Sequence, residues 1–258
     1  MNRRIFFFDI DGTICKNNFV SPRVKKAINN IQKKGDLCFV ASGRPTMFLQ
    51  EAVKNIGFDG YLLYNGAYVV AGDNVIYEDT LNGNEVKEIL SYLRKYNSEY
   101  ALQDASYNYI PKEFNRIFEF FKDDLQVNVD EFVREFDEDE VVKHLLKIEV
   151  WPDNYEVSQK FIQKFPNYKW HQYERLNMEI CMKDISKAWG IQKIIDYYNI
   201  DSKNSYCFGD GPNDLEMFES VAHSYAMENA DEEVKKHAKY ICPSIDNDGV
   251  AVVLESLL

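Results

Sequence analysis

Short apolar segments alternate with helix-forming segments at both ends of this chain, and this alternation constrains its fold more than any other feature. Apolar runs at 4–8, 37–42 and 61–64 have the length and composition of buried strands. A Ser-Pro pair at 21–22 predicts the start of a first helix, and a second helix is predicted over 45–56. Strands that alternate with helices in this way favour right-handed crossovers and a parallel sheet.

The middle of the chain has a different pattern. Roughly residues 84–183 are richer in aromatic and acidic residues and mix helix and strand signals, including a long strand predicted over 144–151. Alternation then resumes, with a helix predicted over 185–198 and a buried strand within 204–211. The fold class expected is α/β, a doubly wound, Rossmann-like parallel-sheet core with a large inserted α+β cap domain. The expected boundaries are 1–82 for the first part of the core, 83–184 for the cap and 185–258 for the second part.

Composition argues against several classes of function. With 30 Lys and Arg against 42 Asp and Glu, the chain of 258 residues has a formal charge of −12. No basic stripe is present to bind nucleic acid or an anionic membrane, and no apolar run approaches the roughly 18 residues of a membrane span. Five widely spaced cysteines, an odd number, favour neither disulfides nor zinc. We therefore expect a cytoplasmic protein, monomeric or weakly homo-oligomeric, with neither nucleic acid nor membrane as partner.

Acidic side chains directly follow two of the predicted strands. Asp9 and Asp11 come after the first strand, and Asp210 and Asp214 lie in GDGPND after the strand within 204–211. Because open α/β sheets bind ligands beyond the carboxyl ends of their strands, we expect these carboxylates to converge at one edge. Converging carboxylates without a counter-charge are costly, and a hard divalent cation such as Mg²⁺ would neutralise them. The sequence therefore predicts a magnesium site.

Two further features suit a phosphorylated substrate. SGRP places the Ser42 hydroxyl and the Gly43 N–H at the end of the second strand. Lys187 lies in the first turn of a predicted helix, where a cation is unfavourable unless an anion is close. Each motif alone is weak, and a lone DxDG is usually a turn, but together, in order at strand ends, they predict a site for a small phosphorylated metabolite such as a sugar phosphate.

The segments DIDGT, SGR, Lys187 and GDGPND together resemble the four signature motifs of the haloacid dehalogenase-like phosphatases. The place of the insert, between the second and third motifs, resembles the Cof-like subclass, also called IIB. YNGAYVV, ISKAWG and IDNDGVAVVLE also resemble that subclass, whereas AMENA at 226–230 departs from it by carrying Glu228. The resemblance implies a Mg²⁺-dependent phosphoric monoester hydrolase.

The resemblance also implies a role for each matching residue. Asp9 would be the nucleophile that forms an aspartyl-phosphate, and Asp11 would act first as general acid and then as general base. Mg²⁺ would be held by the Asp9 carboxylate, the Asp11 backbone carbonyl and Asp210, with Asp214 in support. The phosphoryl oxygens would be held by Ser42, Gly43, Lys187 and Asn213.

The leaving group is expected to be recognised largely by the cap. In the stretch 168–180, aromatic faces could pack on a sugar ring and polar ends could reach its hydroxyls, although the same pattern fits a cap strand with half-buried aromatics. The residues expected to influence substrate selectivity are Arg44, Asn65, Trp170, His171, Tyr173 and Arg175.

Alternatives to a phosphatase stay open at this point. A phosphomutase would return the phosphoryl group to its substrate instead of to water. A phospho-receiver signalling module uses a similar set of residues on a doubly wound sheet, but the second acid, Asp11, and the large insert argue against it. A non-catalytic metabolite-binding protein would be the remaining alternative.

Overall fold

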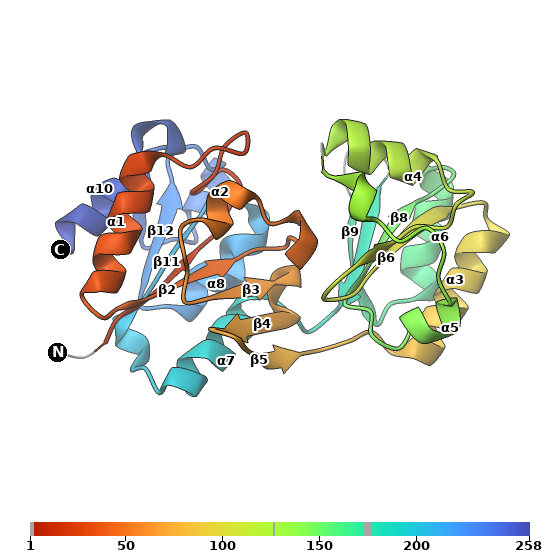
Figure 1. Cartoon of the computed structure of the whole chain (residues 1–258), viewed down its shortest axis with the longest axis horizontal. Helices are drawn as coiled ribbons and strands as arrows, with labels where there is room; N and C mark the ends of the chain where they lie inside the picture. Colours follow the sequence, from red (N-terminus) through yellow and green to blue (C-terminus); the bar gives the residue numbers. More distant parts are fainter. Residues whose placement is uncertain (1–2, 126, 173–176) are drawn as a thin grey trace. The chain divides into compact units, whose positions relative to one another are not determined.

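The computed structural model divides the chain into two compact units (Figure 1). It describes residues 3–125, 127–172 and 177–258. The first unit, here called the core unit, comprises Met1–Arg44, Leu49–Glu78 and Ile185–Leu258. The second, the cap unit, comprises Asp79–Asp184 together with the short segment Pro45–Phe48. The range expected for the insert, 83–184, thus lies within the cap unit.

The core unit contains an eight-stranded sheet in the order β13-β12-β11-β1-β2-β3-β4-β5. The strands from β13 to β3 pair in parallel, whereas β3–β4 and β4–β5 pair antiparallel. The strands are β1 (Ile5–Phe8), β2 (Leu37–Ala41), β3 (Gly60–Leu63), β4 (Tyr68–Ala71), β5 (Asn74–Glu78), β11 (Ser205–Gly209), β12 (His223–Met227) and β13 (Tyr240–Cys242). The helices are α1 (Pro22–Lys33), α2 (Glu51–Lys54), α7 (Lys187–Tyr198), α8 (Leu215–Ser220), α9 (Glu232–Lys235) and α10 (Gly249–Ser256).

The direction of winding reverses at β1. This strand pairs with β2 on one side and with β11 on the other. The strands that follow β1 early in the chain therefore lie on one side of it, and those from the end of the chain lie on the other side. Open α/β sheets bind ligands at such a switch point, beyond the carboxyl ends of the strands. The predicted α/β class with a doubly wound parallel sheet is confirmed.

Strand β1 is apolar throughout because helices cover both faces of the sheet. Ile5 and Phe7 share one hydrophobic core with residues of α7 and α8. Phe6 and Phe8 point to the opposite face, because side chains alternate along a strand, and they too are completely buried. Helices α1 and α10 lie side by side in the core unit (Figure 1). The predicted start of α1 is also present, with the Ser21 hydroxyl accepting a hydrogen bond from the Arg23 N–H.

The cap unit contains a five-stranded antiparallel sheet in the order β7-β6-β8-β10-β9. Helices α3 and α6 cover one face, so that Leu102 and Ile148 pack against residues such as Leu93 and Phe161. The opposite face is partly covered by a second, smaller core around Phe121. The strands are β6 (Glu99–Gln103), β7 (Asn108–Tyr109), β8 (Lys147–Trp151), β9 (Tyr168–Gln172) and β10 (Met178–Met182). The helices are α3 (Gly83–Lys95), α4 (Arg116–Glu119), α5 (Glu138–Val141) and α6 (Tyr155–Lys164).

Two predicted elements were wrong in extent. The helix predicted over 45–56 is interrupted, since Thr46–Phe48 forms a short 3₁₀ turn and α2 begins only at Glu51. The reason is that the Phe48 ring packs against Phe121 and Phe132 of the cap unit, with ring centroids 5.4 and 5.9 Å apart. The strand predicted over 144–151 begins only at Lys147, because the turns that follow α5 extend to that point.

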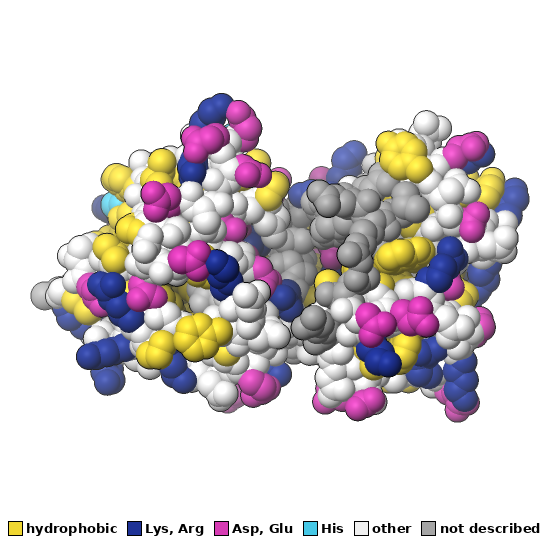
Figure 2. Space-filling view, turned by 90° about the horizontal axis from the view of Figure 1, so that it is seen from above, with side chains coloured by type: hydrophobic (Ala, Val, Ile, Leu, Met, Phe, Trp, Pro, Cys, Tyr) yellow, Lys and Arg dark blue, Asp and Glu magenta, His cyan; other side chains and the backbone are white. Residues whose placement is uncertain are grey.

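The exposed surface carries charges of both signs. On the face shown in Figure 2, acidic and basic side chains lie among one another on each unit. Within the described residues, no helix combines the length and the apolar character needed to cross a membrane.

Candidate active site

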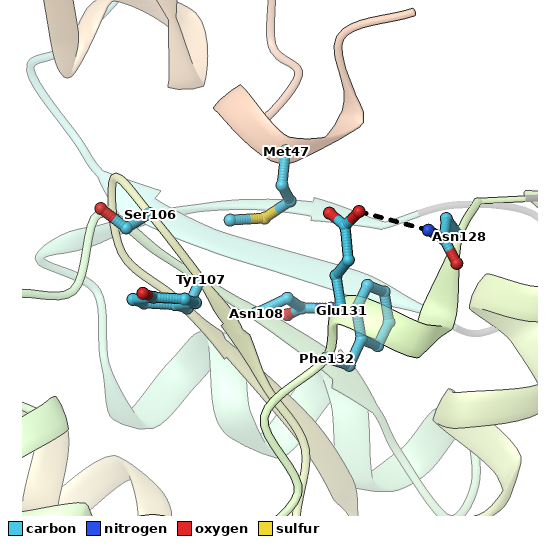
Figure 3. Close-up of a pocket in the computed structure, with 7 residues that line it drawn as sticks. All are labelled: Met47, Ser106, Tyr107, Asn108, Asn128, Glu131 and Phe132. Carbon is cyan, nitrogen blue, oxygen red and sulfur yellow. Dashed lines mark hydrogen bonds between the residues drawn. The ribbon is translucent and has the colours of Figure 1, made fainter.

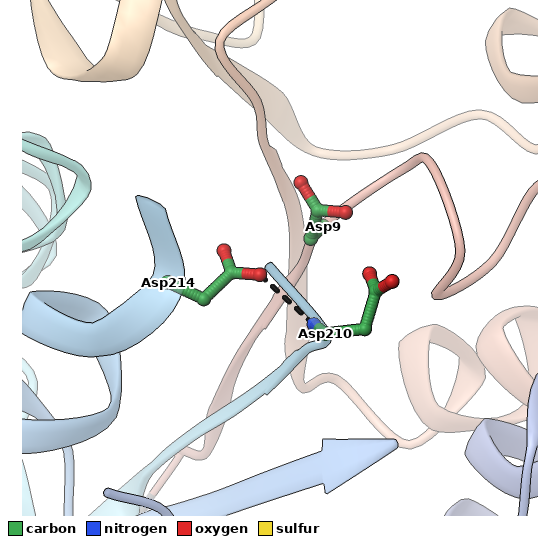
Figure 4. A group of neighbouring side chains, drawn as sticks. All are labelled: Asp9, Asp210 and Asp214. Carbon is green, nitrogen blue, oxygen red and sulfur yellow. Dashed lines mark hydrogen bonds between the residues drawn. The ribbon is translucent and has the colours of Figure 1, made fainter. Parts of the chain in front are cut away.

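The switch point of the core sheet brings three carboxylates together. Phe8 of β1 is in register with Phe208 of β11, and Asp9 and Asp210 follow these two strands. Asp214 comes from the short turn that precedes α8. Oxygen atoms of Asp9, Asp210 and Asp214 lie within 4.8 Å of one another (Figure 4), as the positions of these residues after neighbouring strands predicted.

Lys187 is the counter-charge for two of these carboxylates. Its Nζ lies 2.6 Å from Asp9 Oδ1 and 2.6 Å from Asp214 Oδ1. The lysine side chain is completely buried, and it reaches the site from the first residue of α7, where Ser186 caps the helix. A cation in this first turn is explained by the anions that surround it. Burial alone would lower the pKa of Lys187, but Asp214 and Asp9 outweigh that effect and raise the pKa above its ordinary value.

Asp214 holds the loop that carries Asp210. Its second oxygen, Oδ2, accepts hydrogen bonds from the backbone N–H groups of Asp210 and Gly211, at 2.9 and 3.0 Å (Figure 4). A Cβ on Gly209 would lie 2.4 Å from this same oxygen, so the glycine makes the close approach possible. Both oxygens of Asp214 are therefore engaged within the protein, as suits a supporting residue.

Asp210 is oriented by two residues that the sequence analysis did not assign to the site. The Thr13 hydroxyl donates to Asp210 Oδ1 at 2.9 Å. Asn229 Nδ2 donates to the Gly12 carbonyl at 2.9 Å and lies 3.5 Å from Asp210 Oδ2. Thr13 closes DIDGT and Asn229 lies in AMENA, so their presence in these two motifs was the available signal. The adjacent Glu228 is exposed and accepts a hydrogen bond from the Ser244 N–H.

Burial makes it unfavourable to ionise this cluster of carboxylates completely. Burial, reinforced by Asp214, raises the pKa of Asp9 to about 8 even though Lys187 acts in the opposite direction. Burial also raises the pKa of Asp210 to about 6, against the hydrogen bond from Thr13, which lowers it. Three carboxylates face one lysine, so the cluster lacks positive charge.

A divalent cation fits this deficit. Carboxylate oxygens are the ligands that Mg²⁺ prefers, and Mg²⁺ commonly uses only a few of them together with water and substrate oxygens. Burial makes the ionised forms of Asp9 and Asp210 unfavourable. These are also the two carboxylates whose Oδ2 atoms would be offered to the ion. The donor set and its charge therefore suit Mg²⁺.

Asp11 lies apart from this cluster. Its carboxylate forms a two-point ion pair with Arg44, with Nε–Oδ2 at 2.6 Å and Nη2–Oδ1 at 2.9 Å. The side chain is about half exposed, at 55%. Asp11 is not part of the three-carboxylate cluster, and its carboxylate contacts Arg44 instead.

A second polar cluster lies at the ends of β2 and β3. The Ser42 hydroxyl accepts a hydrogen bond from the Arg44 N–H, and its own proton can be donated elsewhere. Asn65 Oδ1 accepts from Asn213 Nδ2 at 3.2 Å. A Cβ on Gly43 would lie 2.9 Å from Asn65 Oδ1, so Gly43 allows this asparagine to approach the loop closely. The residues predicted to bind phosphate all belong to the core unit: Ser42 and Gly43 follow β2, Asn213 lies in the turn before α8, and Lys187 begins α7.

The predicted specificity residues of the cap are only partly described. Trp170 is half-buried on β9, stacks on Phe161 and donates its indole N–H to the Phe165 carbonyl at 3.0 Å. These contacts belong to the hydrophobic core of the cap unit. His171 lies in β9, and its backbone pairs with Glu179 of β10. Tyr173 and Arg175 lie outside the described residues.

Comparison with known proteins agrees with this geometry. A family model for haloacid dehalogenase-like hydrolases matches residues 6–254. The whole chain is 29% identical to the putative phosphatase YkrA of Bacillus subtilis, of which it covers 98%. A solved structure of a hypothetical protein from Geobacillus kaustophilus is 25% identical, with a TM-score of 0.90 over 99% of this chain and 98% of that one. The HAD subclass IIB sugar phosphatase BT4131 is 26% identical, with a TM-score of 0.82 over 98% of each chain.

Proposed function

Because the chain belongs to the haloacid dehalogenase-like hydrolase family and is a phosphatase, we propose that it hydrolyses small phosphorylated metabolites, sugar phosphates above all, with Mg²⁺ and through an aspartyl-phosphate. The observation that carries the proposal is the gathering of Asp9, Asp210 and Asp214 around Lys187 at the switch point of the sheet. A sugar phosphate is favoured because one structural relative is a sugar phosphatase.

In the first step an oxygen of the Asp9 carboxylate attacks phosphorus. The bond between phosphorus and the leaving-group oxygen breaks, and that oxygen takes a proton from the Asp11 carboxyl group. Lys187 holds Asp9 in place through its 2.6 Å contact and supplies positive charge beside the phosphoryl group. Asp11 must first leave Arg44, because its two oxygens are both occupied by the guanidinium. General acid catalysis of this kind contributes about 10²–10⁴-fold.

In the second step water hydrolyses the aspartyl-phosphate. Asp11, now ionised, takes a proton from the water, whose oxygen bonds to phosphorus as the bond to Asp9 breaks. Inorganic phosphate leaves, and Asp9 and Asp11 return to their initial states. Ser42 and the backbone of Gly43, with Asn213, orient the phosphoryl oxygens during both steps. Covalent catalysis divides one difficult reaction into two easier ones.

The carboxylates of Asp9 and Asp210 and the backbone carbonyl of Asp11 would hold Mg²⁺, with Asp214 fixing the Asp210 loop. When bound, the ion supplies positive charge that favours the ionised form of Asp9 and neutralises phosphoryl oxygens. Thr13 and Asn229 hold the Asp210 carboxylate in place through their contacts with its two oxygens. We further propose that the protein works in the cytoplasm, as a monomer or weak homo-oligomer.

The proposal is tested by following inorganic phosphate from a panel of hexose, pentose and polyol phosphates, with Mg²⁺ or with EDTA. We expect phosphate release with Mg²⁺, its loss in EDTA, and recovery when Mg²⁺ is restored. Following the 1-phosphate isomer of each hexose 6-phosphate separates hydrolysis from mutase activity. Full activity in EDTA, or isomer without phosphate, would contradict the proposal.

A further inference from the structure

Asp11 carries a proton for part of the proposed reaction and is ionised for the rest of it, so its hydrogen-bond partners have to suit both forms. Arg44 suits only one of them. A guanidinium has N–H donors and no acceptor, so the two-point contact with Arg44 binds the carboxylate and offers nothing to the proton of the carboxylic acid. A group that can also accept a hydrogen bond is therefore expected beside Asp11.

Gln50 is such a group, and it lies in the same core unit as Asp11 and Arg44. Its Nε2 donates to Asp11 Oδ1 at 3.5 Å, which is longer than the 2.9 Å contact of Arg44 with the same oxygen. Its Oε1 is buried and has no hydrogen-bond partner among the described residues. A buried amide oxygen nearly always has a partner. The side chain therefore meets the carboxylate with its donor and keeps an acceptor unused.

The amide of Gln50 carries N–H donors and a carbonyl acceptor at the end of the same side chain. Rotation about the last side-chain bond exchanges their places, and this bond has no strong preference. With its N–H toward Asp11 the amide bonds the carboxylate, and with its carbonyl toward Asp11 it accepts the proton of the carboxyl group. Gln50 can thus serve both forms of Asp11, whereas Arg44 cannot.

The backbone of Gln50 is fixed, although its side chain is not tied to a helix. Its carbonyl accepts hydrogen bonds from the N–H groups of Val53 and Lys54 at 2.9 and 3.0 Å, and its side chain makes no capping hydrogen bond to α2. The preceding segment, Pro45–Phe48, is anchored by packing within the cap unit, where Met47 lines a cavity (Figure 3). The substrate therefore does not have to order this part of the chain before Gln50 can act.

We infer that Gln50 is a positioning residue for the acid–base group: its amide holds Asp11 in place in both protonation states once Arg44 has moved away. The inference rests on the proposed phosphatase function and adds a residue that the sequence analysis did not assign. Gln50 acts directly on neither phosphorus nor the leaving group, so its effect on the reaction passes through Asp11.

The test compares kcat/KM for two substrates that differ in how much they need an acid. The first is the alkyl phosphate of the panel that the wild type hydrolyses fastest, whose leaving oxygen is strongly basic. The second is 4-nitrophenyl phosphate, whose leaving oxygen is weakly basic and needs little protonation. In Gln50→Leu, which removes both polar atoms and keeps the size of the side chain, we expect the alkyl-to-nitrophenyl ratio to fall about tenfold, a part of the 10²–10⁴-fold that general acid catalysis supplies.

Gln192→Leu is the matched control for this comparison. It removes an exposed glutamine of the core unit whose amide donates to Asp196 at 2.7 Å, and it should keep the wild-type ratio. Gln50→Leu should also keep the wild-type Tm, because it removes only a long contact and leaves no carboxylate buried without a partner.

A double-mutant cycle shows whether the effect of Gln50 passes through Asp11. In Asp11→Asn the acid–base group is already absent, so adding Gln50→Leu should lower kcat/KM for the alkyl phosphate by less than about twofold further. A loss as large as in the wild-type background would overturn the inference.

An unchanged alkyl-to-nitrophenyl ratio in Gln50→Leu would also overturn it, and so would a lower Tm together with an equal loss for both substrates, since these would indicate a structural role. In each of these outcomes the wild type still releases phosphate and the proposed function stands. Release from no phosphate ester would contradict the proposed function itself, and with it this inference.

Discussion

Arg44 and Asp11 form a two-point ion pair across a separation of 33 residues in the sequence, with both oxygens of the carboxylate engaged. Asp11 is 55% exposed, and ion pairs between exposed side chains typically contribute only about 0–1 kcal/mol to stability. Because of this exposure, we expect the pair to matter more for the reaction than for stability. In the proposed mechanism the pair holds Asp11 ready until the leaving group takes the place of the guanidinium.

Substitutions that break the pair should therefore lower activity and have little effect on stability. We expect Asp11→Asn to lower kcat by about 10²-fold or more, because an amide can serve as neither general acid nor general base. Arg44→Ala should reduce activity less. Urea unfolding should change by no more than about 1 kcal/mol in either variant. A large loss of stability in Asp11→Asn would mean that the pair is mainly structural.

For Lys187, whose contacts are buried, we expect a substitution to lower both stability and activity. Lys187→Met leaves Asp9 and Asp214 buried without their counter-charge, which typically costs about 3–5 kcal/mol. Phosphate release should be lost as well. Lys203→Met removes an exposed lysine that pairs with Asp201, and should change neither property appreciably. Urea titration of the three proteins measures the difference, and equal stability of both variants would refute this view of the site.

Substitutions at two glycines allow the effect of backbone conformation on stability to be compared with the effect of a close contact on activity. Gly12 and Gly35 have φ of +82° and +88°, but only at Gly12 would a Cβ meet another residue, 2.1 Å from Asp210 Oδ2. Gly35→Ala should cost about 1–2 kcal/mol in unfolding free energy and leave turnover intact. Gly12→Ala should cost at least as much and also reduce phosphate release more than tenfold, by displacing Asp210. Equal turnover in the two variants would exclude this role for the glycine.

The cap unit should contribute its own pH dependence of stability. Burial raises the pKa of Glu149 to about 8, with Glu179 acting in the same direction and with Lys147 and Asn177 opposing. The folded state therefore binds this proton more tightly than the unfolded chain, whose value is 4.5. The stability that results is present below about pH 4.5 and is lost as the pH rises toward 8.

Glu149→Gln stays neutral, so we expect it to match the wild type near pH 5 and to be progressively more stable toward pH 8. Chemical unfolding at a series of pH values measures the difference. Glu156→Gln, on the exposed side of α6, is the control and should not reproduce this gain. Parallel curves for wild type and Glu149→Gln would show that Glu149 is ionised in the folded protein.

Local patterns in the sequence were sufficient for the parts of this fold that depend on local interactions. Apolar strands followed by Asp9 and Asp210 predicted both the parallel sheet and the convergence of the carboxylates, because the geometry of parallel strands brings their ends together. The interruption of the helix predicted over 45–56 could not be foreseen. It depends on Phe48 meeting Phe121 and Phe132, which lie far along the chain.

In the site, too, residues with a local sequence signal could be predicted, and contacts that depend on tertiary structure could not. Lys187 could be assigned because a lysine in a first helical turn already suggests an anion. The pairing of Arg44 with Asp11, and that of Asn229 with the Gly12 carbonyl, depend on side-chain directions in loops, which no periodic pattern encodes.

The central claim is that Asp9 becomes phosphorylated during turnover, and acid-quench trapping tests it most directly. Enzyme mixed with substrate and Mg²⁺ is quenched within the first turnover, digested, and the modified peptide is identified by mass spectrometry. We expect one phosphoryl group on the peptide that contains Asp9 and none in Asp9→Asn, whose phosphate release should fall about 10³-fold or more. Asp11→Asn should slow both the formation and the hydrolysis of this phosphorylated form. Phosphate release at the wild-type rate by Asp9→Asn, or a phosphoryl group on another residue, would contradict the account.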